Sequence, residues 1–351
     1  MEYKIALIGC GNVGEGFLQI LQEKAGWLKS QHNFEAKVVA ICDKFRGNLV
    51  VPEGIDLGKL LPLLAHGQRI NDYDPVQGNL SLDPLDMIEN IEADIICELT
   101  STDIKTGEPA TSYIRKALRC GKHVVTSNKG PAALNYPELV KLARQNNVFF
   151  RVEGTVMSGT PVFSLFENGL SGNTVLSIRG ILNGTTNFIL SRMEESNLTY
   201  EEALAEAQKL GYAEADPTAD VEGFDALAKV MILASVIFDH PLKMEEVERK
   251  GIVGIKPEDI RQALKRNERL KLIAQIKNHG GQITARVAPE SLSLADPLAR
   301  IMGVQNALVF ELEPLGQIMI QGPGAGKKET GYAILNDILF IHRNLIGRKV
   351  H

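Results

Sequence analysis

Cysteine is scarce in this chain, which has 351 residues and only four cysteines. None of them forms a C-x-x-C pair, so the sequence excludes a disulfide scaffold, a zinc knuckle and a thioredoxin-like motif. Basic residues are outnumbered by acidic ones, 38 against 43. The resulting net charge of −5 excludes non-specific electrostatic binding of the whole protein to nucleic acid. Long apolar runs are missing too: the longest, Val230–Phe238, is far shorter than the ~20 residues of a membrane-spanning helix, and no signal-peptide pattern opens the chain. We therefore expect a cytoplasmic protein with no nucleic-acid or membrane partner.

What the sequence does contain is typical of a large globular protein, with 44% hydrophobic and 23% charged residues and enough length for about two domains. In the first half, short apolar runs alternate with longer amphipathic stretches, which predicts a doubly wound parallel sheet with crossover helices. The expected strands are Lys4–Ile8, Lys37–Cys42, Asp94–Leu99, His123–Thr126 and Val148–Val152, and the expected helices are Phe17–Leu28, Glu108–Arg119 and Pro137–Asn146. The Gly-, Pro- and Asp-rich segment 44–90 predicts an elaborated connection with one short helix, Leu57–Leu64.

The second half predicts an α+β domain with a second sheet. The expected helices are Pro161–Leu170, Gly184–Met193, Tyr200–Leu210, about Gly223–Ile237 and about Thr330–Ile346, and the expected strands are Ser177–Leu182, Ile283–Pro289, Ala307–Leu312 and Gln317–Gln321. Thr199 and Glu202 have the spacing of a capping box. The last helix follows a Gly-rich turn, GPGAG, at residues 322–326.

A glycine-rich turn follows the first expected strand and opens the first helix. Its residues match G-x-G-x-x-G and are Gly9, Cys10, Gly11, Asn12, Val13 and Gly14. This context indicates a Rossmann-type dinucleotide site, in which the turn approaches a pyrophosphate at a helix N-terminus; a purely structural turn is the alternative. Asp43, 29 residues after the last glycine, closes the second strand and can bind the adenine ribose. Because Lys44 and Arg46 follow it, the choice between NAD and NADP stays open.

Polar residues end two further strands of the same sheet. Thr100 and Ser101 follow the third strand, and Lys129 follows the fourth in the sequence TSNKG. The carboxyl ends of parallel strands border the ligand crevice of a doubly wound sheet. Lys129 can therefore meet a phosphate, a ribose or a substrate carboxylate, or it is simply a solvated loop lysine.

A second charged group lies in the apolar helix near residue 230. Asp225 and Lys229 are four residues apart and share one face of a helix that is otherwise apolar until Asp239. A lysine in such surroundings suits acid–base work, although a buried structural ion pair has the same pattern. Glu214, Asp216 and Asp220 precede this helix, either as a cage for a substrate ammonium group or as a solvated acidic loop.

The stretch ILNGTTN at residues 181–187 ends a strand and opens a helix. Free backbone N–H groups at Gly184 and Thr185 could hold a substrate carboxylate. Ordinary N-capping by Asn or Thr is the alternative interpretation of the same residues.

At these motifs the chain resembles homoserine dehydrogenase. The signature A-x-x-x-G-Y-A-x-x-D-P-x-x-D-V-x-G-x-D-x-x-x-K matches residues 207–229 at its fixed positions. ILNGTTN, TSNKGP at residues 126–131 and GPGAG at residues 322–326 resemble further blocks of this family, in the same order. The resemblance extends over nearly the whole chain.

The resemblance implies an NAD(P)-dependent oxidoreductase that reversibly reduces L-aspartate 4-semialdehyde to L-homoserine, a step of threonine and methionine biosynthesis. By position, Lys229 matches the general acid–base lysine and Lys129 a second lysine near cofactor and substrate. Glu214 and Asp225 match acidic residues that bind the amino-acid substrate, and Asp220 matches a further acidic residue that supports the site. Gly184 and Thr185 remain the expected position of the substrate carboxylate. The matching cofactor residues are those of the Gly-rich turn with Asp43, Thr100, Ser101, Lys129 and Gly326. The family also implies a homodimer joined through the second sheet.

A structural monovalent cation, Na⁺, is a further implication of the resemblance. The matching positions are Glu153, Val156, Ser158 and Thr160, which act mostly through backbone oxygens; Gly154, Met157 and Ser158 depart from the family pattern. We expect a nucleotide-binding Rossmann domain over residues 1–152, an inserted substrate and dimerisation domain over residues 153–321, and a return of residues 322–351 to the first domain.

Two other functions fit the same scaffold: a different amino-acid or semialdehyde oxidoreductase, and a non-catalytic nicotinamide-binding regulator. Retention of Lys229, Lys129 and the acidic loop disfavours the regulator. Cys10 is either a redox-sensitive thiol or, more simply, a small buried apolar residue. Because the sequence ends soon after the last helix, we also expect no threonine-sensing domain of the kind that larger family members append.

Overall fold

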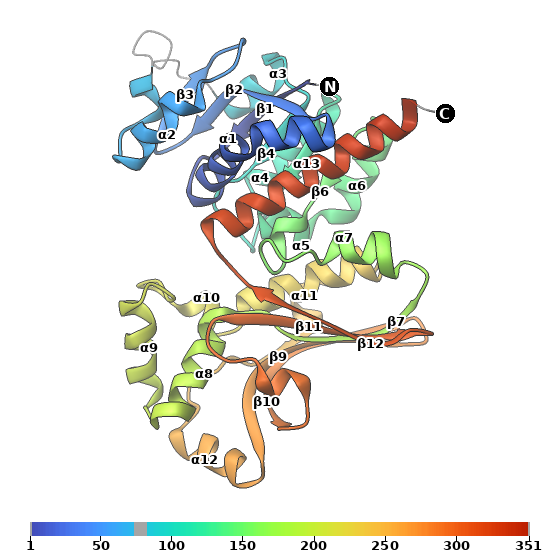
Figure 1. Ribbon diagram of the computed structural model, residues 1–351. Helices are drawn as coiled ribbons and strands as arrows, with labels where there is room; N and C mark the ends of the chain where they lie inside the picture. The colour runs from blue at the N-terminus through green and yellow to red at the C-terminus, as the bar shows by residue number, and fades with distance from the viewer. Residues whose placement is uncertain (1, 74–82, 350–351) are drawn as a thin grey trace. The chain divides into compact units, whose positions relative to one another are not determined.

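The computed structural model describes residues 2–73 and 83–349, which form two compact units (Figure 1). Unit 1 comprises Met1–Gly159 together with Gly326–His351, and unit 2 comprises Thr160–Ala325. The first unit is therefore built from two stretches that are distant in sequence. Residues 153–159 group with unit 1 and residues 322–325 with unit 2, a few residues away from the boundaries expected from the sequence.

Unit 1 is built around a six-stranded sheet with the order β3-β2-β1-β4-β5-β6. Its strands are β1 (Glu2–Ile8), β2 (Glu35–Asp43), β3 (Gly47–Val50), β4 (Ile95–Glu98), β5 (His123–Thr126) and β6 (Phe150–Arg151). All neighbouring strands pair in parallel except β3, which pairs antiparallel with β2 at the edge. The parallel Rossmann-type sheet expected from the sequence is confirmed, and the carboxyl ends of β1, β2, β4 and β5 share one rim.

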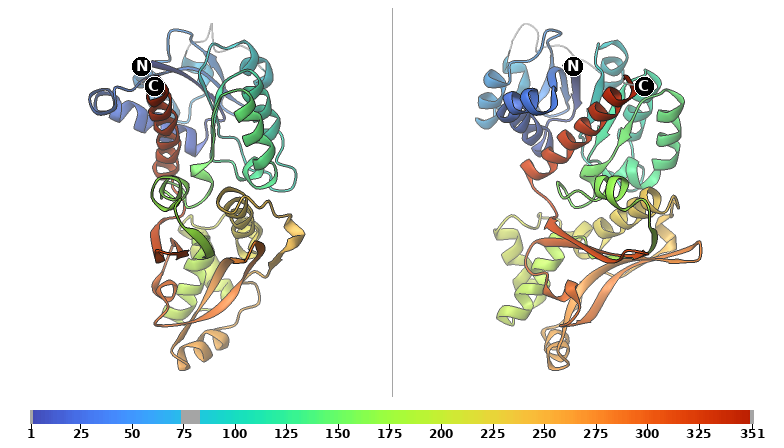
Figure 2. Two further views of the ribbon diagram at one scale, coloured as in Figure 1. Left: turned by 90° about the vertical axis from the view of Figure 1, so that its right-hand side faces the viewer. Right: turned by 45° about the vertical axis from the view of Figure 1, so that its right-hand side comes forward.

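Helices cover both faces of this sheet. They are α1 (Asn12–His32), α2 (Leu57–Ala65), α3 (Pro84–Asn90), α4 (Ala110–Arg119), α5 (Lys129–Leu134), α6 (Tyr136–Gln145) and α13 (Lys327–Lys349). In Figure 2, α1 and α13 lie on one side of the sheet, and α4 and α6 lie on the other. Gly16 and Gly331 allow α1 and α13 to pack closely, since a Cβ atom on Gly331 would lie only 2.5 Å from the Phe17 nitrogen.

The connection from Lys44 to Asn90 contains more secondary structure than its sequence predicts. Strand β3 and helix α3 were not predicted, whereas α2 lies where the leucine-rich patch predicts a helix; residues 74–82 are outside the described residues. Strand β3 has four residues, too few for a recognisable alternation. Helix α3 depends on a local signal, the Asp83 carboxylate that accepts a hydrogen bond from the Leu85 nitrogen at 2.8 Å.

Unit 2 contains a six-stranded sheet with the order β12-β11-β7-β9-β10-β8. Its strands are β7 (Thr174–Ile181), β8 (Val247–Arg249), β9 (Glu268–His279), β10 (Gln282–Ser293), β11 (Gln305–Glu313) and β12 (Gly316–Pro323). Pairing is antiparallel apart from that of β10 with β8. This confirms the expected α+β class. Strand β9 was missed because its charged residues hide the apolar alternation.

The helices of unit 2 are α7 (Phe163–Leu165), α8 (Gly184–Ser196), α9 (Tyr200–Lys209), α10 (Thr218–Val221), α11 (Phe224–Ile237) and α12 (Pro257–Lys265). Thr199 and Glu202 form the predicted capping box at the start of α9. The expected helix Pro161–Leu170 is instead the short α7 followed by a π-helical turn, Phe166–Leu170, and α12 was not predicted. None of the helices in the described part of the chain is long and apolar enough to span a membrane.

Candidate active site

The Gly-rich turn of unit 1 has the backbone geometry that a pyrophosphate requires. Gly9 has a φ of +89°, and a Cβ atom there would lie 2.6 Å from the Leu99 carbonyl oxygen, so only glycine fits. Gly11 is the N-cap of α1, without a side-chain cap, and a Cβ at Gly11 would meet nothing within 4 Å. Gly11 and Asn12, where α1 begins, are exposed, which suits an anion at the helix N-terminus.

Asp43, at the end of β2, ties this turn to the neighbouring strand. Its Oδ2 accepts a hydrogen bond from the Cys10 nitrogen at 2.7 Å, and its Oδ1 accepts from the nitrogens of Phe45 and Arg46 at 2.9 and 2.8 Å. The Cys10 side chain is fully buried, and burial raises the pKa of its thiol to about 12. Cys10 is thus an unreactive apolar filler rather than a redox-sensitive thiol.

A buried glutamate, Glu15, holds the cations near the turn. Its carboxylate pairs with Arg46 at 3.0 Å and with Lys327 from the start of α13. Burial opposes ionisation, but the hydrogen bonds from Lys327 and Arg46 outweigh it and lower the pKa of Glu15. Glu15 could not be recognised from the sequence, because its second partner is 312 residues away.

The rim formed by β4 and β5 brings Thr100, Asn128 and Glu98 together. Glu98 is fully buried; its Oε1 accepts hydrogen bonds from the Thr100 nitrogen and hydroxyl, and its Oε2 accepts from the Thr126 hydroxyl at 3.0 Å. Burial raises the pKa of Glu98 to about 7. The Asn128 amide bonds the carbonyl oxygens of Thr100 and Ser101 at 3.3 and 3.4 Å. Glu98 was missed, although an acidic residue in an apolar strand was a signal.

Lys129 is the first residue of α5 and is half-buried. Asn128 caps this helix by accepting a hydrogen bond from the Gly130 nitrogen at 3.1 Å. Asn128 also donates to the carbonyl oxygens of Thr100 and Ser101, so the start of α5, where Lys129 lies, is held at the rim of the sheet.

In unit 2, the predicted pair on α11 lies within a polar cluster. The Lys229 ammonium group donates to Asp225 Oδ2 at 2.7 Å and to the Leu182 carbonyl oxygen at 2.5 Å, and Lys229 is only 6% exposed. The Asn183 amide donates to Asp225 at 3.0 Å and to Asp220 at 2.6 Å. Burial, and next the Asp225 charge, raise the pKa of Asp220. Asn183 therefore contacts two aspartates that lie 37 and 42 positions further along the sequence.

Two predicted residues of the acidic loop stay outside this cluster. Glu214 and Asp216 are exposed, and Asp216 accepts a hydrogen bond from the Thr218 nitrogen at 3.1 Å. The loop is nevertheless attached to α8, because the Thr185 hydroxyl donates to the Tyr212 carbonyl oxygen at 2.7 Å. The start of α8 is capped by Asn183, whose Oδ1 accepts from the Thr186 nitrogen at 2.8 Å. Asn183 therefore caps α8 and also contacts Asp220 and Asp225.

The turn at residues 153–158 is buried throughout. Met157 and Ser158 both have positive φ values, 57° and 56°, which is strained for residues other than glycine. The Glu153 nitrogen donates to Asp337 at 2.9 Å, and the Ser158 and Thr330 hydroxyls lie 2.7 Å apart. Val156 is fully buried in the same turn, whereas Thr160 belongs to unit 2 and donates to the Pro323 carbonyl oxygen at 3.4 Å.

Comparison with known proteins identifies relatives over the whole chain. The homoserine dehydrogenase family model matches residues 161–339, and the model of the NAD-binding domain of homoserine dehydrogenase matches residues 9–153. The NAD(+)-dependent homoserine dehydrogenase of Pseudomonas canavaninivorans is 45% identical, covering 100% of this chain and 99% of that protein. The homoserine dehydrogenase of Methanocaldococcus jannaschii is 40% identical, covering 97% and 98%. A hyperthermophilic archaeal homoserine dehydrogenase, solved in complex with NADPH, superposes with a TM-score of 0.83 at 32% identity, covering 98% of each chain.

Proposed function

The chain belongs to the homoserine dehydrogenase family, and we propose that its Lys229 is the general acid–base group of the reversible, NAD(P)-dependent reduction of L-aspartate 4-semialdehyde to L-homoserine. The observation that carries this proposal is the buried Lys229–Asp225 pair on α11, 2.7 Å apart. An ion pair in an apolar helix is costly to bury, so its presence there supports a chemical role.

The nicotinamide ring, when bound, exchanges a hydride with the substrate carbon. The residues of the chain donate or accept the proton that accompanies this hydride transfer. In the reduction, negative charge develops on the aldehyde oxygen, and the Lys229 ammonium group donates a proton to it; in the oxidation, the neutral amine removes the hydroxyl proton. The Lys229 ammonium group donates to Asp225 Oδ2 at 2.7 Å, and the Asn183 amide fixes the orientation of Asp225. We also propose that Lys129, which matches a second lysine of the family pattern, takes part in the proton transfer.

We assign separate binding groups to the ammonium and carboxylate ends of the amino-acid substrate. Asp220 and Glu214 supply negative charge for the substrate ammonium group. The first turn of α8, at Gly184 and Thr185, supplies backbone N–H groups for its carboxylate. The hydrogen bond from Thr185 to Tyr212 supports this arrangement, since it links the start of α8 to the loop that carries Glu214.

The cofactor site comprises the turn from Gly9 to Gly14 with Asp43, Thr100, Ser101, Lys129 and Gly326. We propose a preference for NAD over NADP. A carboxylate at Asp43 attracts ribose hydroxyls and repels a 2′-phosphate. Glu15 supports the preference, because it pairs with Arg46 and Lys327, two cations that could otherwise bind that phosphate.

We further propose a structural Na⁺ ion at the turn of Glu153, Val156 and Ser158, with Thr160 following. The donor set fits, because carboxylate, hydroxyl and backbone oxygens are the hard ligands that such a cation prefers. A cation there would also stabilise the buried, strained turn and the nearly inaccessible Glu153 carboxylate, which is 1% exposed.

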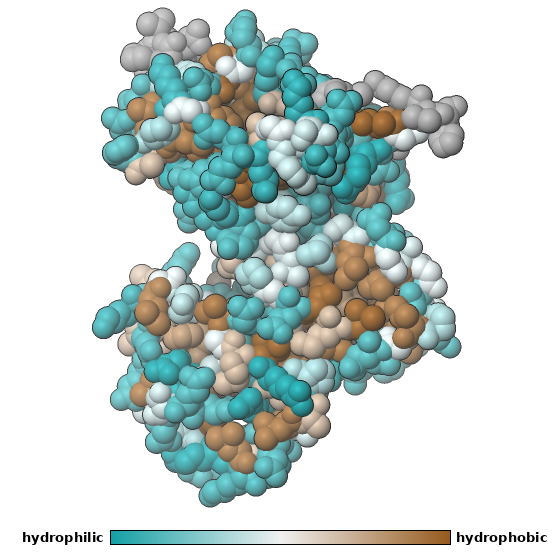
Figure 3. Space-filling model, viewed as in Figure 1, coloured by the Kyte–Doolittle hydropathy of each residue, from teal (hydrophilic) through white to brown (hydrophobic). Residues whose placement is uncertain are grey.

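A cytoplasmic homodimer joined through unit 2 is our remaining proposal. Strand β12 lies at the edge of its sheet, and Ile318, Met319 and Ile320 are only partly buried. Leu176 on β7 and Leu315 beside β12 are 39% and 53% exposed. Figure 3 shows hydrophobic residues at the surface over β11 and β12, which supports coverage by a second copy.

One paired assay tests the proposed function. Purified protein is incubated with L-homoserine and either NAD⁺ or NADP⁺, and reduced nicotinamide is followed by absorbance, with L-serine and L-threonine as control substrates. We expect turnover with homoserine alone, faster with NAD⁺. The absence of hydride transfer from homoserine to either nucleotide would overturn the proposal.

A further inference from the structure

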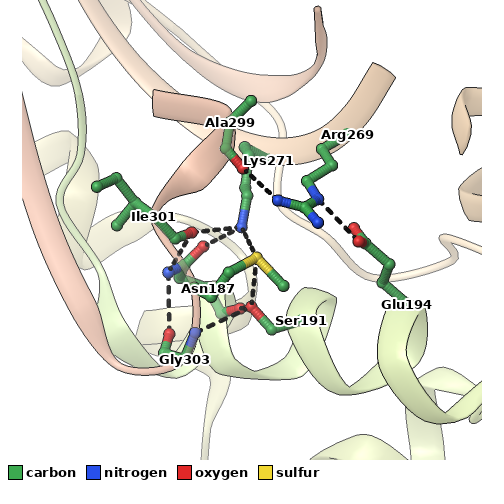
Figure 4. Close-up of polar contacts among 9 residues, drawn as sticks. Asn187, Ser191, Glu194, Arg269, Lys271, Ala299, Ile301 and Gly303 are labelled. Carbon is green, nitrogen blue, oxygen red and sulfur yellow. Dashed lines mark hydrogen bonds and ion pairs between the residues drawn. The ribbon is translucent and has the colours of Figure 1, made fainter. Parts of the chain in front are cut away.

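A second lysine of unit 2, Lys271 on β9, is buried even more completely than Lys229. It is 1% exposed, and its ammonium group donates to the Ile301 carbonyl oxygen at 2.5 Å and to Asn187 Oδ1 at 3.0 Å (Figure 4). The Met302 sulfur, a weak acceptor, lies 3.3 Å away. Lys271 is not among the residues that the family resemblance assigns to the reaction.

Within the described residues, the buried charge of Lys271 has no carboxylate partner. An acidic residue of α8, Glu194, is paired instead with Arg269 at 2.8 Å, and Arg269 also donates to the Ala299 carbonyl oxygen (Figure 4). Burial lowers the pKa of Lys271 to about 8. A buried cation satisfied only by neutral acceptors destabilises the fold, so the three N–H groups must serve another purpose.

That purpose is visible in the segment 299–305, which lies between β9 and α8. The Asn187 amide donates to the carbonyl oxygens of Ile301, Gly303 and Gln305 at 3.2, 2.9 and 3.3 Å. The Ser191 hydroxyl accepts a hydrogen bond from the Gly303 nitrogen at 3.1 Å. Lys271 and these two residues of α8 therefore bind the segment through its backbone, which makes the contact independent of most of its side chains.

The same segment presses against the first turn of α8. A Cβ atom on Gly184 would lie 2.8 Å from the Val304 carbonyl oxygen, so the two backbones are nearly in contact. Asn187 is one helical turn beyond Asn183, the residue that holds Asp220 and Asp225. A shift of the segment would displace Gly184 and Asn183 together.

We propose that Lys271 is a positioning residue for the amino-acid substrate: by fastening Asn187 and the segment 299–305, it fixes the first turn of α8, where the substrate carboxylate binds. This inference rests on the function proposed above. It predicts that Lys271 affects binding of homoserine and not of the dinucleotide, because its contacts lie entirely within unit 2.

The test is steady-state kinetics of Lys271→Met, which keeps the length of the side chain and removes its donors. We expect KM for homoserine to rise about tenfold, while kcat and KM for NAD⁺ change less than threefold. Lys277→Met is the matched control, since Lys277 lies on the same strand and the same face but is exposed. It should leave all three constants unchanged.

Two further variants separate positioning from general stability. Asn187→Leu should raise KM for homoserine similarly, and the double variant with Lys271→Met should add little, because both act through one contact. Ser191→Ala removes a single hydroxyl from the network and should raise KM about threefold even if Lys271→Met fails to fold.

The outcomes distinguish this proposal from the function on which it rests. Wild-type protein that does not oxidise homoserine overturns the proposed function and this inference with it. Folded Lys271→Met or Ser191→Ala with an unchanged KM for homoserine overturns the inference alone, as does a fall in melting temperature with unchanged kinetic constants.

Discussion

Replacing Lys229 by methionine tests the proposed chemistry most directly. The change removes the group that donates to Asp225 and to the Leu182 carbonyl oxygen, and it leaves the size of the side chain nearly intact. General acid–base assistance is worth about 10²–10⁴-fold in rate. Because we propose that Lys129 also takes part in the proton transfer, we expect the lower end, a fall in kcat of about 100-fold, with KM for NAD⁺ unchanged.

The same variant should also lose stability. Asp225 would remain partly buried beside Asp220 without its cation, and the removal of one partner of a buried pair costs about 3–5 kcal/mol. Asp225→Asn combined with Lys229→Met removes both charges and should recover most of that stability. It should not recover turnover, since the proton donor is still missing.

The assay is homoserine oxidation at saturating NAD⁺, followed by absorbance, with urea unfolding measured in parallel. Lys209→Met, an exposed lysine at the end of α9, is the control for loss of a positive charge. Turnover of Lys229→Met within threefold of the wild type would refute the assigned role. Full recovery of kcat in the double variant would show that the lysine acts only by maintaining the fold.

Three other predictions concern the cofactor, a buried charge and the cation. Asp43→Asn should raise the ratio of kcat/KM for NADP⁺ to that for NAD⁺ about tenfold, and an unchanged ratio would contradict the role of this carboxylate. Burial, and to a smaller extent the Arg269 charge, lowers the pKa of Lys271 to about 8, although Glu194 and Glu195 act in the opposite direction, so the unfolded chain binds more protons than the folded chain between pH 8 and 10.5. Urea unfolding should therefore show the wild type gaining about 2 kcal/mol relative to Lys271→Met from pH 8 to pH 10, and parallel curves would refute this. Replacing Na⁺ by tetramethylammonium should lower the melting temperature of the wild type by several degrees but not that of Glu153→Gln; an equal loss in both would count against the site.

Local spacing explains which parts of the site were predictable. Gly9, Gly11 and Gly14 lie within six residues, and the turn needs only its own backbone geometry. Asp225 and Lys229 are one helical turn apart, so any helix places them on one face. Fold class followed in the same way from alternating apolar runs.

Residues that act through distant partners were not predictable in this way. Glu15 meets Lys327 across 312 residues, and Glu98 depends on Thr126 from the next strand. Asn183 carried an N-cap signal, and the structure shows that its amide also joins Asp220 to Asp225. Strand β9 was missed altogether, and Lys271 with it.

The sequence by itself determined that this chain builds a Rossmann-type unit with a Gly-rich turn and carries a lysine paired with an aspartate four residues before it. These features depend on residues that are close in sequence, and the regular backbone geometry of helices, strands and turns fixes how such residues lie. Tertiary structure alone decided that the last helix packs on α1, that Asp43 braces the turn, and that Lys271 fastens the segment under α8. Each of these depends on burial and on strand order, which bring together groups whose separation in sequence carries no signal.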